Sequence, residues 1–440
     1  MVRILEYSIV DVRLESRVDH SLGSLADGSS KLVSQRNDIT LDRRLESSPA
    51  GPGELFISVY QPYNLLLSLG HLVSILSFTM NKNSKLKRSF KLKAMGIVGG
   101  ISALTLSACG TSASSSASPS SAASVAKKVP LIVYAAEGYD AAMVKGFQKA
   151  TGIPTELEDH STGTLLAKIS AEANNPQWGV FWSDGSESYA ALDQQGMLLR
   201  GFEPNTGTLT PLGKSLVPAD KSYIPTGTTI AGAIVYNSNV VKNPPTTWDQ
   251  LLSPTWKGAV GMNNPAISGP TYPVVASIMD QKGGVSQGEA YFKALAANGL
   301  HVYSTNKVTL GALLQGTIKL AIVQNSAGIG FEYTNPSLKV AYLDKSALLP
   351  GIIGIDAKQP AAEIAEAKKF ADFVYSKAGQ ALMLSGDPHG DSLFFPIIVG
   401  TKAHKVVPSL ASIPTDYPNP VVWGPREASL NQWFTNNIVQ

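Results

Sequence analysis

The sequence predicts an α/β protein with parallel, doubly wound sheets and more than one domain. Short apolar strands alternate with helical segments along most of the chain, and such strand–loop–helix repeats are typical of parallel sheets covered by helices. The chain has 440 residues, a length that favours two or three domains. Hydrophobic residues make up 44% of the sequence, which is enough apolar material for a large core.

The alternation starts near residue 129. VPLIVY (129–134) is typical of a buried strand, and a helix is expected over Asp140–Thr151 because Met143 and Phe147 follow helical spacing before Gly152. Further strands are expected at Ile153–Leu157, Val180–Trp182, Ile230–Tyr236, Ala259–Met262 and Lys319–Gln324. Further helices are expected at Thr164–Ala173, Ser188–Gln195, after Thr271, and at Pro360–Tyr375 with a continuation over Gln380–Leu384. The last 40 residues are rich in Pro and Trp, and we expect them to wrap the first domain.

The charge of the chain is uneven. The whole sequence has 36 basic and 33 acidic residues, but residues 1–108 hold 13 of the basic and 9 of the acidic ones. The remainder is nearly neutral, so it lacks the basic surface of a nucleic-acid-binding protein. A single cysteine, Cys109, excludes a disulfide framework and a zinc site built on several thiolates.

Residues 80–108 have the pattern of a signal peptide. Six Lys and Arg residues between Met80 and Lys93 precede a short apolar stretch, Ala94–Thr105, which is too short to span a bilayer as a mature helix. The following Leu-Ser-Ala and Cys109 resemble the lipobox of bacterial lipoproteins. The resemblance implies that Cys109 is lipidated and becomes the new N-terminus; a buried cysteine after an ordinary helix is the alternative.

The segments on either side of this pattern need separate explanations. A signal peptide belongs at an N-terminus, so we interpret residues 1–79 as an upstream extension from a mis-called start, with Met80 as the initiator. The alternative is that the apolar stretch at 63–80 forms a first membrane segment. Residues 109–128 are rich in Ser and Ala, and we expect a flexible tether there.

The order of the elements from Val129 to Phe434 carries a family resemblance. The successive segments LIVYAAEGYDAAMVKGFQKATGIPTELE, HSTGTLLAKI, NPQWGVFWSDG, GAIVYNSNVV and PPTTWDQLLSPTWKGAVGMNNP resemble the type 2 solute-binding proteins of ABC transporters. They are most similar to the branch that contains ferric-iron, thiamine, polyamine, sugar-phosphate and aminoethylphosphonate binders. The resemblance implies a two-lobed type 2 periplasmic-binding-protein fold, with crossing hinge strands and the ligand in the cleft between the lobes.

Applied to this sequence, the resemblance assigns residues 129–228 and 348–440 to lobe 1 and residues 229–347 to lobe 2. The crossing segments then lie near Pro225–Gly232 and Ala341–Gly354, and both contain glycine, which can absorb a backbone change in a hinge.

The candidate ligand contacts follow from the position of loops. In open α/β sheets, ligands bind beyond the carboxyl ends of the strands. Ser/Thr/Gly loops before helices also offer free backbone N–H groups that suit an anionic oxygen group. On these grounds the candidate residues are Glu137, Gly138, Tyr139, Ser161, Thr162, Gly163, Thr164, Trp182, Ser183, Asp184, Thr228, Ser268, Gly269, Thr271 and Tyr272. The family resemblance adds Gln324, Asn325 and Ser326.

Several of these residues have a simpler interpretation. Ser161 and Ser268 are good helix N-caps, which need no ligand. Trp182 suits a core position as well as a cleft wall. Glu137 and Asp184 are either partners for a cationic amine or solvated charges at the rim of the cleft.

The resemblance also bears on the kind of solute. Iron-binding relatives carry a pair of Tyr ligands after a lobe 2 strand, where this chain has Gln324 and its neighbours. Their His after the first strand corresponds to Gly138, so only Asp184 remains as a hard ligand and a ferric site is disfavoured. Loops for an anion together with carboxylates favour a small phosphorylated, phosphonate or zwitterionic solute. Thiamine, a polyamine and ferric iron remain alternatives, and no metal or cofactor is expected.

The expected role is that of an extracytoplasmic, lipid-anchored monomer that captures a solute and delivers it to an ABC permease. A ligand-sensing lipoprotein and a secreted hydrolase are the alternative classes. Gly390-Asp391-Ser392-Leu393 spells the GDSL block of a hydrolase family, but His404 has no Asp three residues before it, so we interpret the block as a coincidence. HExxH, GxSxG and Walker motifs are absent from the sequence.

Overall fold

The computed structural model describes residues 129–439 and four two-residue strands nearer the N-terminus. These strands are β1 (Leu14–Glu15), β2 (Leu32–Val33), β3 (Thr40–Leu41) and β4 (Glu54–Leu55). β1 pairs with β4 and β2 with β3, both antiparallel. Apart from these strands, the proposed upstream extension, the signal peptide, Cys109 and the tether lie outside the described residues.

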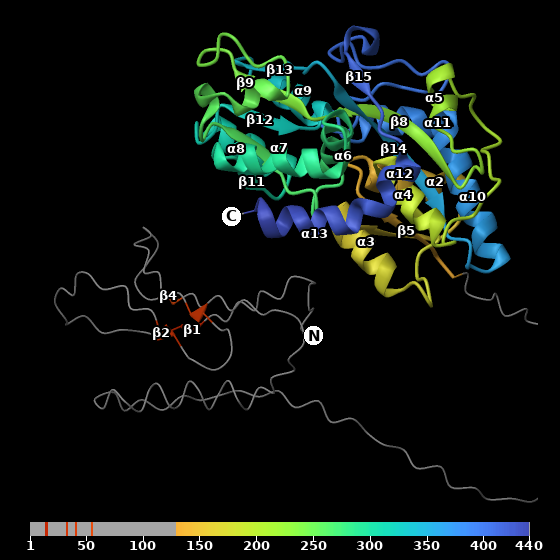
Figure 1. Cartoon of the computed structure of the whole chain (residues 1–440). Coiled ribbons are helices and arrows are strands. Elements are labelled where there is room, and N and C mark those ends of the chain that lie inside the picture. Colours follow the sequence, from red (N-terminus) through yellow and green to blue (C-terminus); the bar gives the residue numbers. More distant parts are fainter. Residues whose placement is uncertain (1–13, 16–31, 34–39, 42–53, 56–128, 440) are drawn as a thin grey trace, which may run out of the picture. The chain divides into compact units, whose positions relative to one another are not determined.

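Residues 129–439 form two α/β lobes, each built around one sheet (Figure 1). The lobe 1 sheet has the order β15-β14-β7-β5-β6, with β8 paired to β14. Its strands are β5 (Leu131–Ala135), β6 (Thr155–Asp159), β7 (Val180–Asp184), β8 (Tyr223–Ala231), β14 (Ser346–Ile355) and β15 (Thr415–Asp416). The β5–β6 and β5–β7 pairs are parallel, as the strand–helix alternation predicts.

Helices cover both faces of the lobe 1 sheet. Their bounds are α2 (Asp140–Thr151), α3 (Thr162–Ala171), α4 (Ser186–Gln194), α5 (Pro211–Ser215), α10 (Ala361–Tyr375) and α11 (Lys377–Ser385). Met143 and Phe147 of α2 pack with Phe370 of α10 in one core, whereas Leu165 of α3 and Tyr189 of α4 belong to another. This doubly wound arrangement confirms the predicted fold class.

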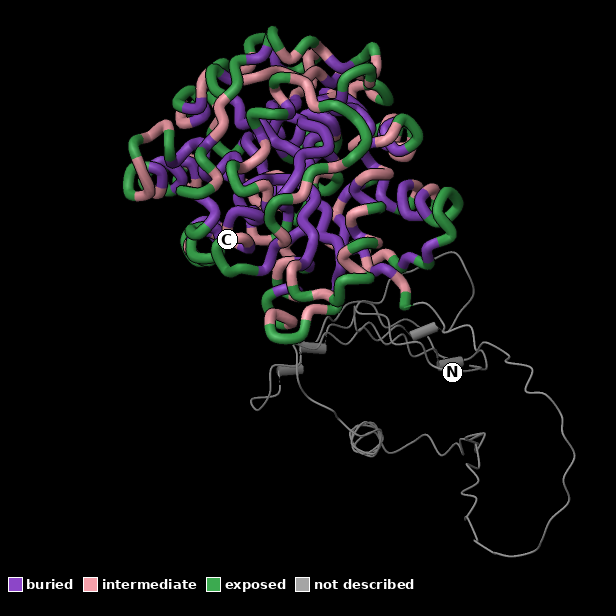
Figure 2. The backbone as a smooth tube through the Cα atoms, turned by 90° about the vertical axis from the view of Figure 1, so that its right-hand side faces the viewer, coloured by how far each residue is buried: buried purple, intermediate pink, exposed green. Residues whose placement is uncertain are grey.

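Lobe 2 repeats the layered plan with the strand order β11-β10-β12-β9-β13. Its strands are β9 (Ala233–Asn237), β10 (Val260–Asn263), β11 (His301–Tyr303), β12 (Leu320–Val323) and β13 (Leu338–Ala341). Its helices are the 3₁₀ turns η1 (Asp249–Leu252) and η2 (Pro254–Trp256), and α6 (Thr271–Gln281), α7 (Val285–Ala297), α8 (Asn306–Leu314) and α9 (Asn325–Thr334). Figure 2 shows buried backbone running through the interior and exposed backbone concentrated in the peripheral loops.

The two lobes are joined by a pair of long antiparallel strands. β8 and β14 pair from Ala347↔Ala231 to Gly354↔Tyr223, and both strands are buried along their whole length. β8 continues into β9 of lobe 2 through Gly232, whose φ of 76° favours glycine. The chain therefore crosses between the lobes where the sequence predicted; hinge motion at these strands stays a prediction.

The C-terminal segment differs from the expectation. It consists of η3 (Leu410–Ser412), α12 (Pro420–Trp423), η4 (Gly424–Arg426) and α13 (Glu427–Asn437). Phe434 of α13 lies 5.3 Å from Phe292 of α7, ring centre to ring centre, inside the lobe 2 core. The assignment of all of residues 348–440 to lobe 1 is therefore wrong for α13, because its apolar face is buried by α7.

The same segment also contacts lobe 1, so it bridges the two lobes. Ser188 Oγ of α4 donates a 2.7 Å hydrogen bond to Glu427 Oε2 at the start of α13. Gly424 lies so close to the Glu187 carbonyl that a side chain there would collide with it. Glu187 and Glu427 are both buried, and burial raises their pKa values to about 8 and about 7.

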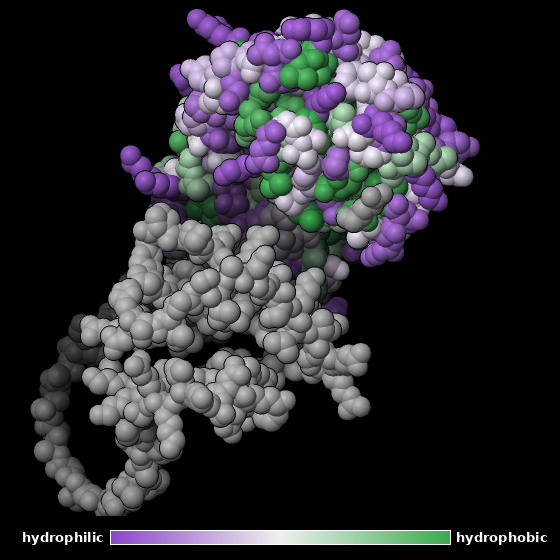
Figure 3. Space-filling view, turned by 90° about the vertical axis from the view of Figure 1, so that its left-hand side faces the viewer, coloured by the Kyte–Doolittle hydropathy of each residue, from purple (hydrophilic) through white to green (hydrophobic). Residues whose placement is uncertain are grey.

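The surface is that of a polar protein. On the face drawn in Figure 3, hydrophilic residues are interspersed with smaller hydrophobic areas. Within residues 129–439, no helix has both the length and the apolar character needed to cross a membrane.

Candidate functional site

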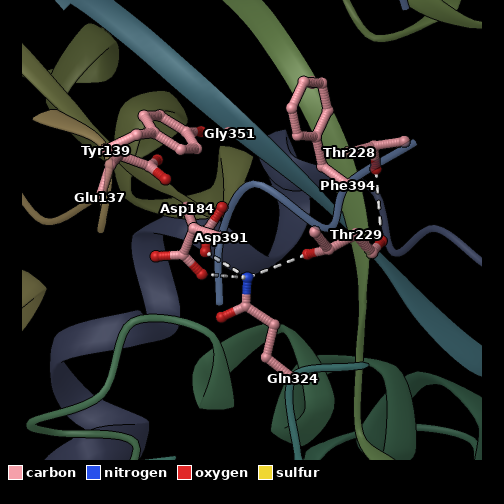
Figure 4. A pocket seen from close by; sticks show the side chains of 10 residues that line it. Glu137, Tyr139, Asp184, Thr228, Thr229, Gln324, Gly351, Asp391 and Phe394 are labelled. Atoms are coloured by element: carbon pink, nitrogen blue, oxygen red, sulfur yellow. Dashed lines mark hydrogen bonds between the residues drawn. The ribbon is translucent and has the colours of Figure 1, made fainter. Parts of the chain in front are cut away.

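The candidate site lies between the lobes, beside the crossing strands. Its lining residues are Glu137, Tyr139, Asp184, Gly227, Thr228, Thr229, Gln324, Gly351, Asp391 and Phe394 (Figure 4). Glu137 and Asp184 follow or end the parallel strands β5 and β7, and Gln324 follows β12, so both sheets present their carboxyl ends to the same space. The cavity volume is only about 10 Å³, enough for one water molecule. The lobes are therefore closed on each other.

Lobe 1 supplies three carboxyl groups to this space. Glu137 is 4% exposed and Asp184 is 7% exposed, and the half-buried Asp391 accepts a 2.8 Å hydrogen bond from the Gly138 N–H at its Oδ2. Glu137 Oε1 is buried and has no hydrogen-bond partner among the described residues. None of the ion pairs within residues 129–439 involves these three groups. The cluster therefore carries acidic groups without a cationic counterpart.

Burial, and for two of the groups a neighbouring charge of the cluster, raises the pKa values of the three acids. For Glu137, burial is the main cause of a strongly raised pKa, followed by the charges of Asp184 and Asp391. For Asp184, burial again comes first and the charge of Asp391 second. Burial raises the pKa of Asp391 to about 6, although the Gly138 N–H and Ser326 hydrogen bonds oppose the shift. A positive charge in the cavity would reverse these shifts.

Gln324 is the residue through which lobe 2 reaches the cluster. Its side-chain nitrogen Nε2 lies 3.1 Å from Asp184 Oδ2, 3.2 Å from Thr229 Oγ1 and 3.4 Å from Asp391 Oδ1. Figure 4 shows this nitrogen at the meeting point of the three contacts. Ser326 Oγ of lobe 2 adds a longer hydrogen bond of 3.4 Å to Asp391 Oδ1.

Aromatic rings form the apolar wall of the cavity. Tyr139 packs against Trp182 at 5.4 Å and against Phe394 at 6.4 Å between ring centres. Trp182 is fully buried and its Nε1 donates to Thr226 Oγ1 at 3.2 Å. Trp182 therefore supports the wall from the core and does not line the cavity.

The predicted Ser/Thr/Gly loops do face each other across the two lobes. The Gly163 N–H at the start of α3 donates to the Ile267 carbonyl of lobe 2 at 3.3 Å. Gly163 and Gly269 both lie so close to the opposite lobe, at Ala266 and Thr162 respectively, that a Cβ atom would collide there. These loops do not line the cavity in the closed form, since each is covered by the other lobe.

The remaining predicted residues have structural partners. Ser161 Oγ caps α3 by accepting from the Thr164 N–H, and Ser268 Oγ accepts from Asn263 Nδ2. Ser183 Oγ is buried against the Tyr189 hydroxyl. Asn325 Oδ1 accepts from the Ile230 N–H of β8 at 2.8 Å, which fixes α9 to a crossing strand.

Thr271 and Tyr272 belong to the buried face of α6, and the Tyr272 hydroxyl donates to the Trp423 carbonyl. Of the predicted set, five residues line the cavity: Glu137, Tyr139, Asp184, Thr228 and Gln324. Five lining residues were missed by the sequence analysis: Gly227, Thr229, Gly351, Asp391 and Phe394. Asp391 belongs to the GDSL block, but nothing in that local sequence indicates that its side chain accepts a hydrogen bond from the Gly138 N–H.

The chain matches a known protein family. Residues 142–392 match the model of the family described as bacterial extracellular solute-binding protein. The chain belongs to this family, and its role is the binding of a solute for ABC import, as the sequence predicted.

Relatives and solved structures agree with this class. A protein of Salmonella typhimurium named "Putative 2-aminoethylphosphonate-binding periplasmic protein" is 26% identical over 242 residues, which is 53% of this chain and 68% of that protein. The solved periplasmic binding protein P5PA has a TM-score of 0.62 at 24% identity and covers 71% of this chain and 100% of its own. The periplasmic binding protein AfuA from Actinobacillus pleuropneumoniae, solved with fructose-6-phosphate, has a TM-score of 0.62 at 20% identity over 70% and 98% of the two chains.

Gly163→Ala is expected to hold the lobes apart without unfolding them. Alanine favours the helix by up to about 1 kcal/mol, but its Cβ collides with Ala266 only when the lobes are closed. The measurement is the interlobe distance by double electron–electron resonance, with Lys145→Cys on α2 and Val308→Cys on α8 in a Cys109→Ser background.

Gly311→Ala is the matched control for Gly163→Ala, because a Cβ atom at Gly311 of α8 meets nothing within 4 Å. A longer interlobe distance in Gly163→Ala alone is the expected result. An unchanged distance with intact folding would contradict the assignment of this contact to closure.

The ligand-free protein is expected to lose stability as pH rises. The unfolded carboxyl groups titrate near pH 4, whereas burial raises the folded pKa of Asp391 to about 6, of Glu427 to about 7 and of Glu187 to about 8. Across this window the folded state binds more protons than the unfolded state, so stability falls with pH. The melting temperature should be lower at pH 8 than at pH 5.5, and Glu187→Gln should reduce the difference. A melting temperature that rises over this range would refute the assignment.

Proposed function

We propose that the protein captures a small solute that carries an ammonium group together with an anionic group, and delivers it to an ABC permease. The observation that carries the proposal is the cluster of two buried acids, Glu137 and Asp184, and the half-buried Asp391, which has no cationic partner among the described residues. Carboxylates removed from water are costly unless a positive charge or hydrogen-bond donors compensate them.

An ammonium group fits this cluster better than a metal ion. Within the described residues, no group of three or more His, Cys, Asp or Glu side chains is arranged to hold a metal. Thr229 Oγ1 lies beside the acids and accepts a hydrogen bond, and Glu137 Oε1 is a buried acceptor without a donor among the described residues. Three N–H donors on one cationic nitrogen match such a set of oxygen acceptors.

The anionic end of the solute is assigned to the start of α3. Ala135 and Asp159, the last residues of β5 and β6, are paired neighbours in the sheet, so the loop before α3 lies about 5 Å along the sheet edge from the loop that holds Glu137. Opening the lobes would release the Gly163 N–H from the Ile267 carbonyl. Free N–H groups at a helix N-terminus favour phosphate-like oxygens.

The relatives support a solute of this kind. The Salmonella relative is named for 2-aminoethylphosphonate, which carries both groups. Thiamine and polyamines also carry cationic nitrogen and remain the second candidates, because the acidic cluster suits them as well. A solute with only anionic groups is disfavoured, since it would face three carboxyl groups.

We also propose that the mature protein is an extracytoplasmic monomer tethered to a membrane through a lipid on Cys109. The signal-peptide pattern and the residues before Cys109 support the anchor, and the periplasmic relatives support the location. We assign no catalytic role, in keeping with a family of solute-binding proteins.

A thermal-shift comparison of matched compounds tests the proposed solute class. At 100 times Kd a ligand stabilises the folded state by about 2.7 kcal/mol. 2-Aminoethylphosphonate should raise the melting temperature, and 2-hydroxyethylphosphonate, which lacks only the ammonium, should not. Equal shifts from both compounds, or a shift from Fe³⁺ alone, would overturn the proposal.

Asp184→Asn tests the site itself. Loss of this charge should weaken 2-aminoethylphosphonate binding by about tenfold or more, because a hydrogen bond to a charged group is worth about 1.5–3 kcal/mol. Asp249→Asn, on an exposed side chain paired with Lys282, is the matched control and should bind as the wild type does.

A further inference from the structure

We infer that Gln324 is a built-in competitor of the solute: its side-chain amide fills the ammonium position in the empty protein and holds the empty lobes closed. This inference rests on the proposed function, because it assumes that the acidic cluster receives an ammonium group. In this arrangement the Gln324 side chain controls both the affinity for the solute and the closure of the lobes.

Three oxygen acceptors surround the Gln324 nitrogen. Asp184, Asp391 and Thr229 each place an oxygen within 3.1–3.4 Å of Nε2. An amide nitrogen has two N–H groups, whereas an ammonium has three and carries a full positive charge. The site therefore has one more oxygen acceptor than the amide has N–H groups. An ammonium group, with three N–H groups and a positive charge, would satisfy all three acceptors.

Side chains of lobe 2 fix the orientation of the Gln324 amide. Asn306 Nδ2 donates to Gln324 Oε1 at 3.5 Å, and Asn263 Nδ2 donates to Asn306 Oδ1 at 2.7 Å. Thr309 Oγ1 donates to Asn263 Oδ1 at 2.5 Å. This chain of side chains leaves the oxygen of Gln324 turned toward lobe 2 and its nitrogen turned toward the carboxyl groups of lobe 1.

The Gln324 amide leaves little space in the cavity. The cavity beside the amide has a volume of about 10 Å³, so a solute larger than a water molecule cannot enter while Gln324 is in place. Gln324 precedes α9 on lobe 2, and the acids belong to lobe 1. Separation of the lobes would withdraw the amide and uncover the acids in one movement.

This arrangement lowers the apparent affinity for the solute. A protein that is closed on its own side chain must first open, so its apparent Kd equals the intrinsic Kd divided by the fraction of molecules that are open. Solutes without a cationic group cannot replace the amide interaction, so the same contact discriminates against them.

Gln324→Met is the direct test. Methionine keeps the volume of the side chain but removes both N–H donors. With the same labels as above (Lys145→Cys and Val308→Cys with Cys109→Ser), the ligand-free variant should show a longer interlobe distance than the protein with Gln324. Its affinity for 2-aminoethylphosphonate by titration calorimetry should be about tenfold tighter, equivalent to about 1.4 kcal/mol.

Gln324→Lys gives the opposite test, because it places a tethered ammonium in the cluster. This variant should be closed, should melt at a higher temperature than wild type at pH 7.5, and should no longer bind 2-aminoethylphosphonate. Gln315→Met and Gln315→Lys, at an exposed glutamine that caps α8 of the same lobe, are the matched controls and should leave distance and affinity unchanged.

The outcomes separate this inference from the proposed function. If wild type binds 2-aminoethylphosphonate and Gln324→Met binds it more weakly or equally, the competitor role is wrong while the solute class stands. If wild type binds none of the amine compounds, the proposed function fails. If, in addition, the ligand-free Gln324→Met protein is as closed as wild type, the inference about Gln324 fails as well. A more open Gln324→Met protein would still support the closing role of the amide.

Discussion

The arrangement of the site depends on a set of acidic groups held at the junction of two lobes. Glu137 and Asp184 are placed by the carboxyl ends of neighbouring parallel strands, and Asp391 is brought to them by its hydrogen bond from the Gly138 N–H. Burial is the main cause of the raised pKa values of all three groups; the charges of Asp184 and Asp391 add to the shift of Glu137, and the charge of Asp391 adds to that of Asp184. The Gly138 N–H offsets part of the cost of this arrangement, and protonation or a further donor such as the Gln324 amide of lobe 2 offsets more of it.

The cost of burying the acidic groups connects solute binding with closure of the lobes. Lobe 2 contributes the Gln324 amide and the Ser326 hydroxyl to the cluster, and backbone and glycine surfaces around Gly163 and Gly269 also meet across the cleft. Closure is therefore stabilised in part by donors from lobe 2 to the acidic groups, and the glycines permit the close approach. A solute that supplies a better donor replaces the amide at the acidic groups. The population then shifts from empty closed molecules to solute-bound closed molecules.

The sequence predicted the fold and those residues of the candidate site that lie at or just after predicted strands. Strand–helix alternation is a local pattern, and the rule that ligands bind beyond strand ends identified Glu137 and Asp184, whereas the family resemblance pointed to Gln324. Asp391 and Phe394 follow no predicted strand of the parallel sheets. Their position depends on long-range contacts such as the Thr228–Phe395 bridge. The placement of α13 on lobe 2 was missed for the same reason, since the partner of its apolar face is decided by tertiary packing.

The central claim concerns which end of the solute meets the acidic cluster. A crystal structure of the complex with 2-aminoethylphosphonate tests it most directly, because the phosphorus atom is easily told from the nitrogen in the electron density. The account predicts the nitrogen within about 3.2 Å of carboxyl oxygens of Glu137, Asp184 and Asp391, with the Gln324 amide displaced. A phosphonate group seated among these carboxyl groups would contradict it.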